Sequence, residues 1–267
     1  MDRRNFLKTG GMVVLGSMAA SSVLRAESLK GAHDASGISS ALNHFGVSQE
    51  DMKKVLAAAL EKGGDYADLF FEHTFNNYVG LQDGAVNRCN SNIDFGVGIR
   101  VLAGDQTGYA YVENVTLKEM LNAARTAARI ATGGKATLPV ALTDKPIKTN
   151  YYSVKMPWEE VILKSKMPYL QRLNDRIFAL DKRVHKVSAS LTDTTSHILF
   201  CNSEGVMYYD YRPMVTLGAV CIMEENGKVE NGYAARAYRM GFEFLNDDVV
   251  ELLAQEAVSK TSILDRK

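Results

Sequence analysis

Residues 95–116 read FGVGIRVLAGDQTGYAYVENVT, and the glycines of this stretch decide between two folds. The Gly-Val-Gly run at 96–98 resembles the start of a phosphate-binding loop. A dinucleotide fingerprint, however, needs a third glycine where this chain has Val101, and then a helix. Residues 97–112 instead alternate around a Gly104-Asp105 turn, which is typical of a β-hairpin. We therefore interpret the glycine pair as a place where another element packs closely on a strand.

The residues that flank this hairpin predict a unit of helices and strands. One helix is expected to begin after Ser48 and another after Thr116, because each of these side chains can accept a hydrogen bond from a backbone N–H of the first turn. Glu119 completes a capping box with Thr116. Further strands are expected at 66–74, 78–82 and 85–92, with a turn at Asp83-Gly84. This first unit spans 48–135.

A second unit is expected after residues 136–150, a segment that holds two of the five prolines and is interpreted as a linker. The pattern predicts a helical stretch over 158–181, interrupted by Pro168, and a last helix from Asn246 to about Ser262. The strands expected between these helices lie at 184–191, 197–202, 206–224 and 228–238. The sequence thus predicts an α+β fold, with mainly antiparallel sheets and flanking helices, in two tandem units at 48–135 and 151–267.

The first 26 residues are expected to direct export. They hold four basic residues and one acidic residue, and residues 10–24 carry no charge. This uncharged run is too short to span a bilayer comfortably, and RRNFLK at 3–8 resembles a twin-arginine signal. The alternative is a basic and apolar N-terminal anchor that is not cleaved. Residues 27–47 lack periodicity and are expected to form a flexible tether. The expected location is periplasmic or extracytoplasmic, with no stable membrane span once the signal is removed.

Composition and motifs assign no site. The 267 residues carry 31 basic and 31 acidic side chains, so nothing indicates a nucleic-acid partner. The histidines form no metal-binding pattern, and each is expected to be a surface or packing residue; they are His33, His44, His73, His185 and His197. The three cysteines have no paired spacing and are expected to be buried free thiols; they are Cys89, Cys201 and Cys221. No catalytic, cofactor-binding or metal-binding residue is predicted.

One aromatic row leaves two interpretations open. Tyr208, Tyr209 and Tyr211 lie close to Arg212 on one expected strand, where they could grip a peptide or a sugar. Aromatic side chains that alternate along a strand more often serve packing, and packing is the favoured interpretation.

Several separated segments resemble the TldD/PmbA family, and the TldD branch in particular. The stretch SNIDFGVGIRVLAGDQTGYAYVENVT at 91–116, followed by LKEMLNAARTAARIA at 117–131, resembles the N-terminal part of that family. Upstream, YADLFFEHTFNNYVGLQDGAVNRCNSN at 66–92 is also similar. Downstream, the stretch from 180 to 239 resembles the second region of the family. The resemblance covers roughly residues 48–265, in the right order.

The resemblance implies a zinc-dependent peptidase. TldD-type members carry an H-E-x-x-x-H helix in a third region, where histidines hold zinc and the glutamate activates water. They act on peptides or unfolded segments, pair with a PmbA-type relative, and have been described as modulators of DNA gyrase. This chain contains no H-E-x-x-x-H. The expectation is therefore the scaffold and substrate-binding part of such an enzyme, working as a homo-oligomer or with a PmbA-like subunit. Zinc is expected in the full-length enzyme only.

The alternative is a non-catalytic module, built on the same scaffold, that binds peptides or a partner subunit. The codons that follow Lys267 would distinguish these hypotheses, because an open frame encoding H-E-x-x-x-H favours the first.

The export signal makes the first testable prediction. Changing Arg3 and Arg4 together to lysine is expected to hold the protein in the cytoplasm, because the twin-arginine route reads the arginine pair. Cell fractionation followed by immunoblotting measures the location. Export of the double variant at the level of the unchanged protein would contradict a twin-arginine route.

Overall fold

The computed structural model describes residues 37–133, 138–147 and 154–261. Within these residues the strands form one seven-stranded sheet in the order β3-β2-β1-β5-β6-β4, and β7 pairs with β6. All pairings are antiparallel except that of β4 with β6. The predicted α+β class with a mainly antiparallel sheet is confirmed. The expected signal at 1–26 lies outside the described residues.

The strands are β1 (Tyr66–Gln82), β2 (Ala85–Ala103), β3 (Gln106–Val112), β4 (Thr143–Asp144), β5 (Val184–Asn202), β6 (Val206–Glu225) and β7 (Lys228–Tyr238). The α-helices are α2 (Ile38–Phe45), α3 (Gln49–Leu60), α4 (Leu117–Ile130), α5 (Leu163–Leu180) and α6 (Asp247–Thr261). Two short 3-10 helices are η1 (Trp158–Glu160) and η2 (Phe242–Phe244). No described helix is long and apolar enough to cross a bilayer.

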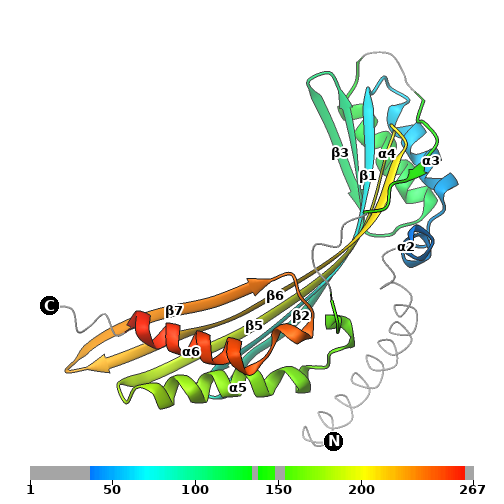
Figure 1. The fold of residues 1–267 in the computed structure, drawn as a ribbon. Helices are drawn as coiled ribbons and strands as arrows, with labels where there is room; N and C mark the ends of the chain where they lie inside the picture. Colours follow the sequence, from blue (N-terminus) through cyan, green and yellow to red (C-terminus); the bar gives the residue numbers. More distant parts are fainter. Residues whose placement is uncertain (1–36, 134–137, 148–153, 262–267) are drawn as a thin grey trace, which may run out of the picture.

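Four long strands, β1, β2, β5 and β6, run from one lobe of the molecule to the other (Figure 1). Helices α2, α3 and α4 lie against the sheet in the upper lobe, and α5 and α6 lie against it in the lower lobe. On β1, Phe71 is buried in the upper lobe and Leu81 in the lower lobe. Both have odd numbers, and alternate residues of a strand point to the same face, so both helical layers cover one face of the sheet. We call the stretch of sheet between the two layers, around residues 73–77 of β1 and 193–197 of β5, the waist.

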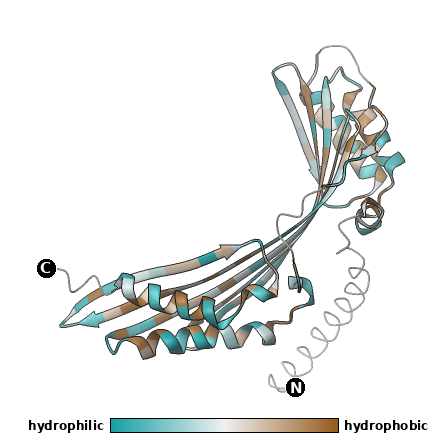
Figure 2. Ribbon diagram, viewed as in Figure 1, coloured by the Kyte–Doolittle hydropathy of each residue, from teal (hydrophilic) through white to brown (hydrophobic). Residues whose placement is uncertain are grey.

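Each lobe has its own hydrophobic core, and each core draws on strands from both predicted units. The upper core includes Leu199 and Met207 of β5 and β6, whereas the lower core includes Val79 and Leu81 of β1. Apolar residues on the ribbon gather between the helices and the sheet in both lobes (Figure 2). The two units are therefore interlocked through one sheet, and neither core is complete without the other unit.

Two strands that the sequence divided are continuous. The expected breaks at 75–77 and 192–196 are wrong, because β1 and β5 pair residue by residue from Asp68 with Asn202 to Gln82 with Ser188. Apart from Phe75, these segments hold only polar side chains, so they lack the alternation of apolar residues that marks a half-buried strand. Their backbones nevertheless keep the ladder, and their side chains form a polar network at the waist.

Part of the expected tether is a helix. Residues 27–47 were expected to be flexible throughout, but 38–45 form α2 and bury Ile38, Ala41 and Phe45. These three residues recur at helical spacing and so make a narrow apolar stripe. Residues 27–36 lie outside the described part of the chain. Within the expected linker, β4 pairs in parallel with the start of β6.

Pro168 does not interrupt a helix, contrary to the prediction. Helix α5 runs through it, and the break lies earlier, between η1 and Leu163. A proline inside a helix removes one backbone hydrogen bond. The helix is held across that position because Leu170, Leu173 and Ile177 are buried in the lower core.

The predicted N-caps and turns are confirmed, but the second capping box is not. Ser48 and Asp51 form a reciprocal capping box, and the hydroxyl of Thr116 accepts from the Glu119 amide at 3.4 Å. The Thr116 amide donates to the carbonyl of Asn114 instead of the Glu119 carboxylate, so the box expected at Glu119 stays half formed. The turn between β1 and β2 has positive φ at both Asp83 and Gly84, as a two-residue hairpin requires. The hairpin of residues 97–112 also forms, and a Cβ at Gly96 would lie 2.6 Å from the backbone carbonyl oxygen of Val112. This glycine therefore serves close packing.

Candidate functional site

Three of the five histidines meet at the waist. His44 comes from α2, His73 from β1 and His197 from β5. The rings of His44 and His197 stack with centroids 4.6 Å apart, and those of His73 and His197 lie 6.4 Å apart. The sequence had placed these residues in the tether and in two different units, so their convergence was missed. We call the three rings the histidine cluster.

Two of the imidazoles are bonded directly to each other. Nε2 of His44 lies 2.8 Å from Nδ1 of His73, across 29 residues of sequence. Since neither atom can both donate and accept at once, one ring donates an N–H and the other accepts with a bare nitrogen. Phe45 and Phe95 pack their rings against His44 and His73 respectively. The pair is therefore enclosed by apolar rings on its upper side.

His197 is held at both ring nitrogens. Its Nδ1 lies 2.6 Å from the hydroxyl of Tyr209, and its Nε2 lies 3.1 Å from Oε1 of Glu159. The other carboxylate oxygen of Glu159 accepts from the hydroxyls of Thr195 and Tyr211, each at 3.1 Å. Glu159 lies in η1, so this contact joins the lower helical layer to the sheet at the waist.

The charge state of this group follows from its contacts. Burial by itself raises the pKa of Glu159, but the hydrogen bond and the charge of His197 lower it more, so the pKa lies below its ordinary value. Burial raises the pKa of Tyr209 and of Tyr211, so both keep their protons. An ionised Glu159 can only accept, and therefore Nε2 of His197 donates to it.

A buried ion pair continues the network toward the lower lobe. Nζ of Lys166 on α5 lies 2.6 Å from Oδ2 of Asp193 on β5, and the two side chains are 5% and 2% exposed. Asn77 of β1 donates to the other carboxylate oxygen at 3.0 Å. Asp193, Thr195 and His197 thus form one polar stripe on the helix-covered face of β5, between the apolar residues of the two cores.

The histidine cluster does not fit a metal. Both nitrogens of His197 already have partners, and the His44 and His73 nitrogens lie at hydrogen-bonding distance from each other. Two ligands at zinc–nitrogen distances of about 2.0–2.1 Å in a tetrahedral site would stand farther apart than 2.8 Å. The described ranges hold no group of three or more histidine, cysteine, aspartate or glutamate side chains arranged for a metal. These three histidines therefore do not form a zinc site.

The predicted aromatic row divides between the two faces of β6. Tyr209 and Tyr211 belong to the waist network, whereas Tyr208 stacks on Phe200 at 5.0 Å between centroids. Arg212 pairs with Asp210. Two tyrosines therefore hold the waist polar groups, which goes beyond the packing role that the sequence favoured.

The cysteines are not all buried. Cys201 and Cys221 are buried free thiols, as expected, but Cys89 is exposed. It lies on the part of β2 that carries no covering helix and pairs on one side only, so the prediction was wrong for this residue.

The first half of β2 presents an unpaired edge. β3 pairs only with residues 97–103, so among the described strands residues 85–96 are bonded to β1 alone. The carbonyl of Ala67 accepts a hydrogen bond from the Ser203 amide, so the backbone N–H and C=O groups of odd-numbered β1 residues point toward β5. Those of even-numbered β1 residues point toward β2, where they bond to even-numbered residues. It follows that the backbone groups of odd β2 residues, such as Ser91 and Ile93, point outward from the sheet.

This free edge leads to a cavity of about 540 Å³ on the helix-free face. Its lining includes Glu72, Asp94, Glu113, Tyr109 and Tyr111 and contains no lysine or arginine. The edge itself, over residues 85–96, contains one arginine, no lysine and no proline. It therefore lacks most of the devices that keep exposed edges from pairing with another strand.

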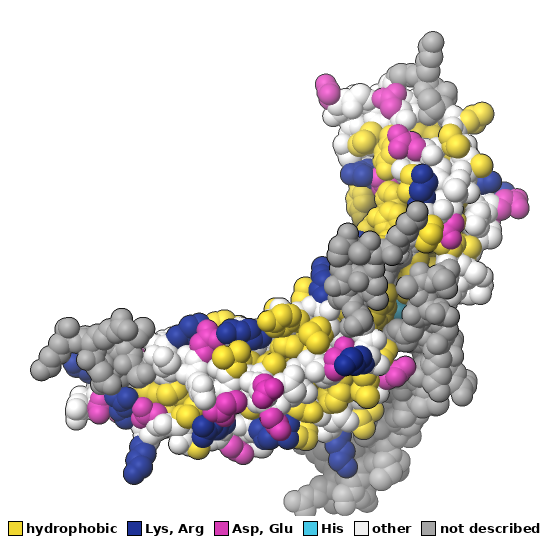
Figure 3. Space-filling view, viewed as in Figure 1, with side chains coloured by type: hydrophobic (Ala, Val, Ile, Leu, Met, Phe, Trp, Pro, Cys, Tyr) yellow, Lys and Arg dark blue, Asp and Glu magenta, His cyan; other side chains and the backbone are white. Residues whose placement is uncertain are grey.

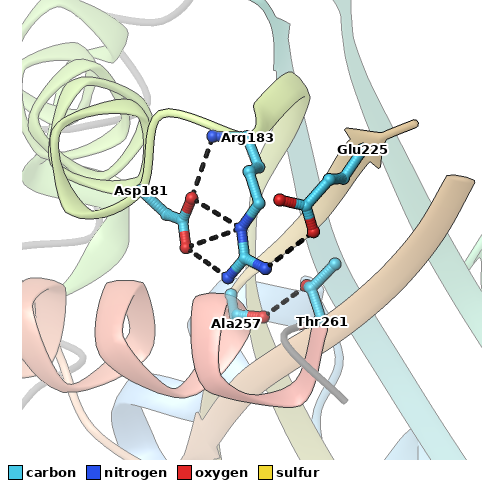
Figure 4. A network of polar contacts seen from close by, with 5 residues as sticks. All are labelled: Asp181, Arg183, Glu225, Ala257 and Thr261. Carbon is cyan, nitrogen blue, oxygen red and sulfur yellow. Dashed lines mark hydrogen bonds and ion pairs between the residues drawn. The ribbon is translucent and has the colours of Figure 1, made fainter. Parts of the chain in front are cut away.

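The outer surface of the lower lobe carries structural ion pairs. Lys and Arg side chains are interspersed with Asp and Glu over the face shown in Figure 3, and Arg176 of α5 pairs with Glu251 of α6 at 2.7 Å. At the far end of the lobe, Arg183 bridges Asp181 and Glu225 (Figure 4). Hydrogen bonds from Arg183 lower the pKa of Asp181. These contacts tie the end of α5 to β5 and β6.

Family profiles match both halves of this architecture. The profile of PmbA/TldA metallopeptidase domain 1 matches residues 67–131, and that of the PmbA/TldA metallopeptidase central domain matches residues 157–264. A Metalloprotease TldD homolog of Haemophilus influenzae is 31% identical over 207 residues, which are 74% of this chain and 42% of that protein. A metalloprotease of Methanocaldococcus jannaschii is 25% identical over 71% of this chain and 42% of its own length.

Solved structures share the fold. A protein from Thermotoga maritima described as a modulator of a DNA gyrase superimposes with a TM-score of 0.62 at 19% identity, over 80% of this chain and 47% of that one. TldE from Thermococcus kodakarensis gives 0.57 at 14% identity, over 79% and 47%. The fold and the domain matches are those of a metallopeptidase scaffold, and the chain belongs to the TldD/PmbA family. It spans less than half the length of the curated relatives it matches.

The buried ion pair yields a stability prediction. Changing Asp193 to asparagine leaves the Lys166 ammonium buried without its counter-charge, which is expected to cost about 3–5 kcal/mol of the free energy of unfolding. The double variant Lys166→Met/Asp193→Val is expected to recover most of that loss, since no charge remains buried. Urea denaturation followed by Trp158 fluorescence measures both.

Arg172→Gln is the matched control. Arg172 also lies on α5, but its ion pair with Asp247 is exposed, with side chains 49% and 83% accessible, so its loss should change stability little. A cost of Asp193→Asn no larger than that of Arg172→Gln would contradict a structural role for the buried pair.

Proposed function

We propose that this chain is the scaffold and substrate-binding portion of an exported TldD-like zinc metallopeptidase. Its metal-binding region, with the H-E-x-x-x-H helix, would lie outside the chain described above. Two observations support this proposal: the first and central domains of the family both match, and the matched length is 42% of a TldD relative. In the whole enzyme the zinc would activate the water that hydrolyses the peptide bond.

The observation that carries the substrate-binding role is the free edge of β2. An extended peptide can add to an open strand edge through main-chain hydrogen bonds, which do not depend on the peptide sequence. Ser91 and Ile93 point their backbone groups outward along this edge. Unfolded protein segments are the substrate class that such an edge recognises, because their backbone groups are not already paired.

The cavity beside the edge supplies a place for one end or one side chain of the peptide. Glu72, Asp94 and Glu113 give it a negative lining, and Tyr109 and Tyr111 give it aromatic surface. A lysine or arginine side chain, or a peptide amino terminus, matches this lining in charge. The role of this chain is therefore to hold and align an extended peptide, and the chemistry belongs to the metal-binding region.

The partner and the location belong to the same proposal. We expect a homo-oligomer or a hetero-oligomer with a PmbA-like subunit, a proposal supported by the structural likeness to TldE. Export through the twin-arginine signal is proposed from residues 1–26 alone. The alternative remains a non-catalytic module on the same scaffold, favoured by the lack of a metal-ligand group among the described residues.

A proline on the edge tests the binding role. Ser91→Pro removes an outward backbone N–H and leaves the ladder to β1 intact. It is expected to weaken binding of a fluorescein-labelled, reduced and carboxymethylated lactalbumin by about fivefold or more, because one backbone hydrogen bond is lost and the ring obstructs the added strand. Fluorescence anisotropy measures the dissociation constant.

Ser91→Ala is the matched control, since both variants lose the hydroxyl that donates to Asn77 but only the proline loses the amide. Equal affinities for the two variants would place the peptide elsewhere. If the purified chain held about one zinc per molecule after dialysis and cleaved the peptide, the proposal that this chain only binds the peptide would be wrong.

A further inference from the structure

Helix α2 is fastened to the sheet by a contact that depends on proton binding. The hydrogen bond between Nε2 of His44 and Nδ1 of His73 needs one of the two nitrogens to be without a proton. If both rings are charged, both nitrogens carry hydrogens, and two positive charges face each other at 2.8 Å. The contact then changes from attractive to repulsive.

We propose that the histidine cluster is a proton-sensitive latch, which holds α2 on the waist at neutral pH and releases it in acid. The hydrogen bond contributes to docking while one ring of the pair is neutral, so it survives the uptake of a first proton. Its contribution is present at neutral pH and is lost once the pH falls far enough for both rings to be charged.

Among the described residues, the carboxylates nearest the pair already have partners of their own. β5 contributes His197, whose ring stacks on that of His44, and β6 contributes the hydroxyls of Tyr209 and Tyr211. η1 contributes the Glu159 carboxylate, which is already bonded to His197 and to two hydroxyls.

Farther along β5, the charge of Asp193 is matched by Lys166 of α5. Glu72 of β1 and Asp94 of β2 are even-numbered, so their carboxylates point to the helix-free face of the sheet, away from the cluster.

The structure also provides the hinge and the surface that release would uncover. Gly46 follows α2 in the left-handed conformation with φ of 67°, and glycine adopts other backbone conformations more readily than any other residue, so the chain can change direction there. Phe45 packs its ring on Phe71 and Phe95, with centroids 5.6 and 5.9 Å apart. Release of α2 would uncover these rings at the waist. Acidity would thus expose a new apolar surface between the lobes.

Hydrogen–deuterium exchange tests the latch on the whole protein. Labelling at pH 7.5 and pH 4.5, with labelling times scaled for the intrinsic exchange rates, gives protection factors for α2 and for α4. We expect the protection of α2 to fall at least tenfold at pH 4.5, while that of α4 stays within twofold. Unchanged protection of α2 in the unmodified protein would overturn the proposal, and this readout needs no variant.

A non-titrating pair makes the second arm. His44→Gln with His73→Asn places amide groups near the positions of the two bonded nitrogens, where they can keep one hydrogen bond without binding a proton. We expect protection of α2 in this double variant to be the same at both pH values. His185→Gln is the control, because His185 is exposed on β5 far from the cluster, and it should keep the full pH response. A pH response that survives in the double variant, or that disappears in the control, would overturn the proposal.

Discussion

The continuous pairing of β1 with β5 is the constraint on which the rest of the structure depends. Every odd-numbered residue of β5 from Val187 to Cys201 is buried on the helix-covered face. Along this stripe the residues change from apolar, through Asp193, Thr195 and His197, to apolar again. Because a strand alternates strictly, the polar residues cannot turn toward solvent without breaking the register of both cores. They must be satisfied in place, and the waist network satisfies them with side chains from β1, η1, α5 and β6.

The same sheet is the basis of the proposed peptide-binding role. Its helices are gathered on one face, so within the described residues the opposite face and the first half of β2 carry no covering helix or paired strand. A rigid sheet that joins two lobes offers a fixed edge on which an extended peptide can be aligned. The waist lies beside that edge in the sheet, since His73 of β1 pairs with Phe95 of β2. A change at the histidine cluster would therefore act close to the proposed peptide site.

Local signals in the sequence predicted the local structure well. The capping residues Ser48 and Thr116 and the Asp83-Gly84 turn each act through neighbours a few residues away. The predicted strand breaks were wrong because the mostly polar segments at the waist lack the period-two signal, although pairing with neighbouring strands holds them extended. The histidine cluster was not predicted for a related reason. His44, His73 and His197 come from three elements far apart in the chain, and no spacing in one sequence encodes such a meeting.

Native-state hydrogen exchange in increasing urea tests most directly whether the sheet and its waist make one cooperative body. Each core contains side chains from both halves of the chain, so the amides of α4 in the upper lobe and of α6 in the lower lobe should lose protection in one shared transition. Their opening free energies should converge on the global value at the same urea concentration. Loss of protection in α6 at a distinctly lower concentration than in α4, or the reverse, would show two independent domains and would contradict the account.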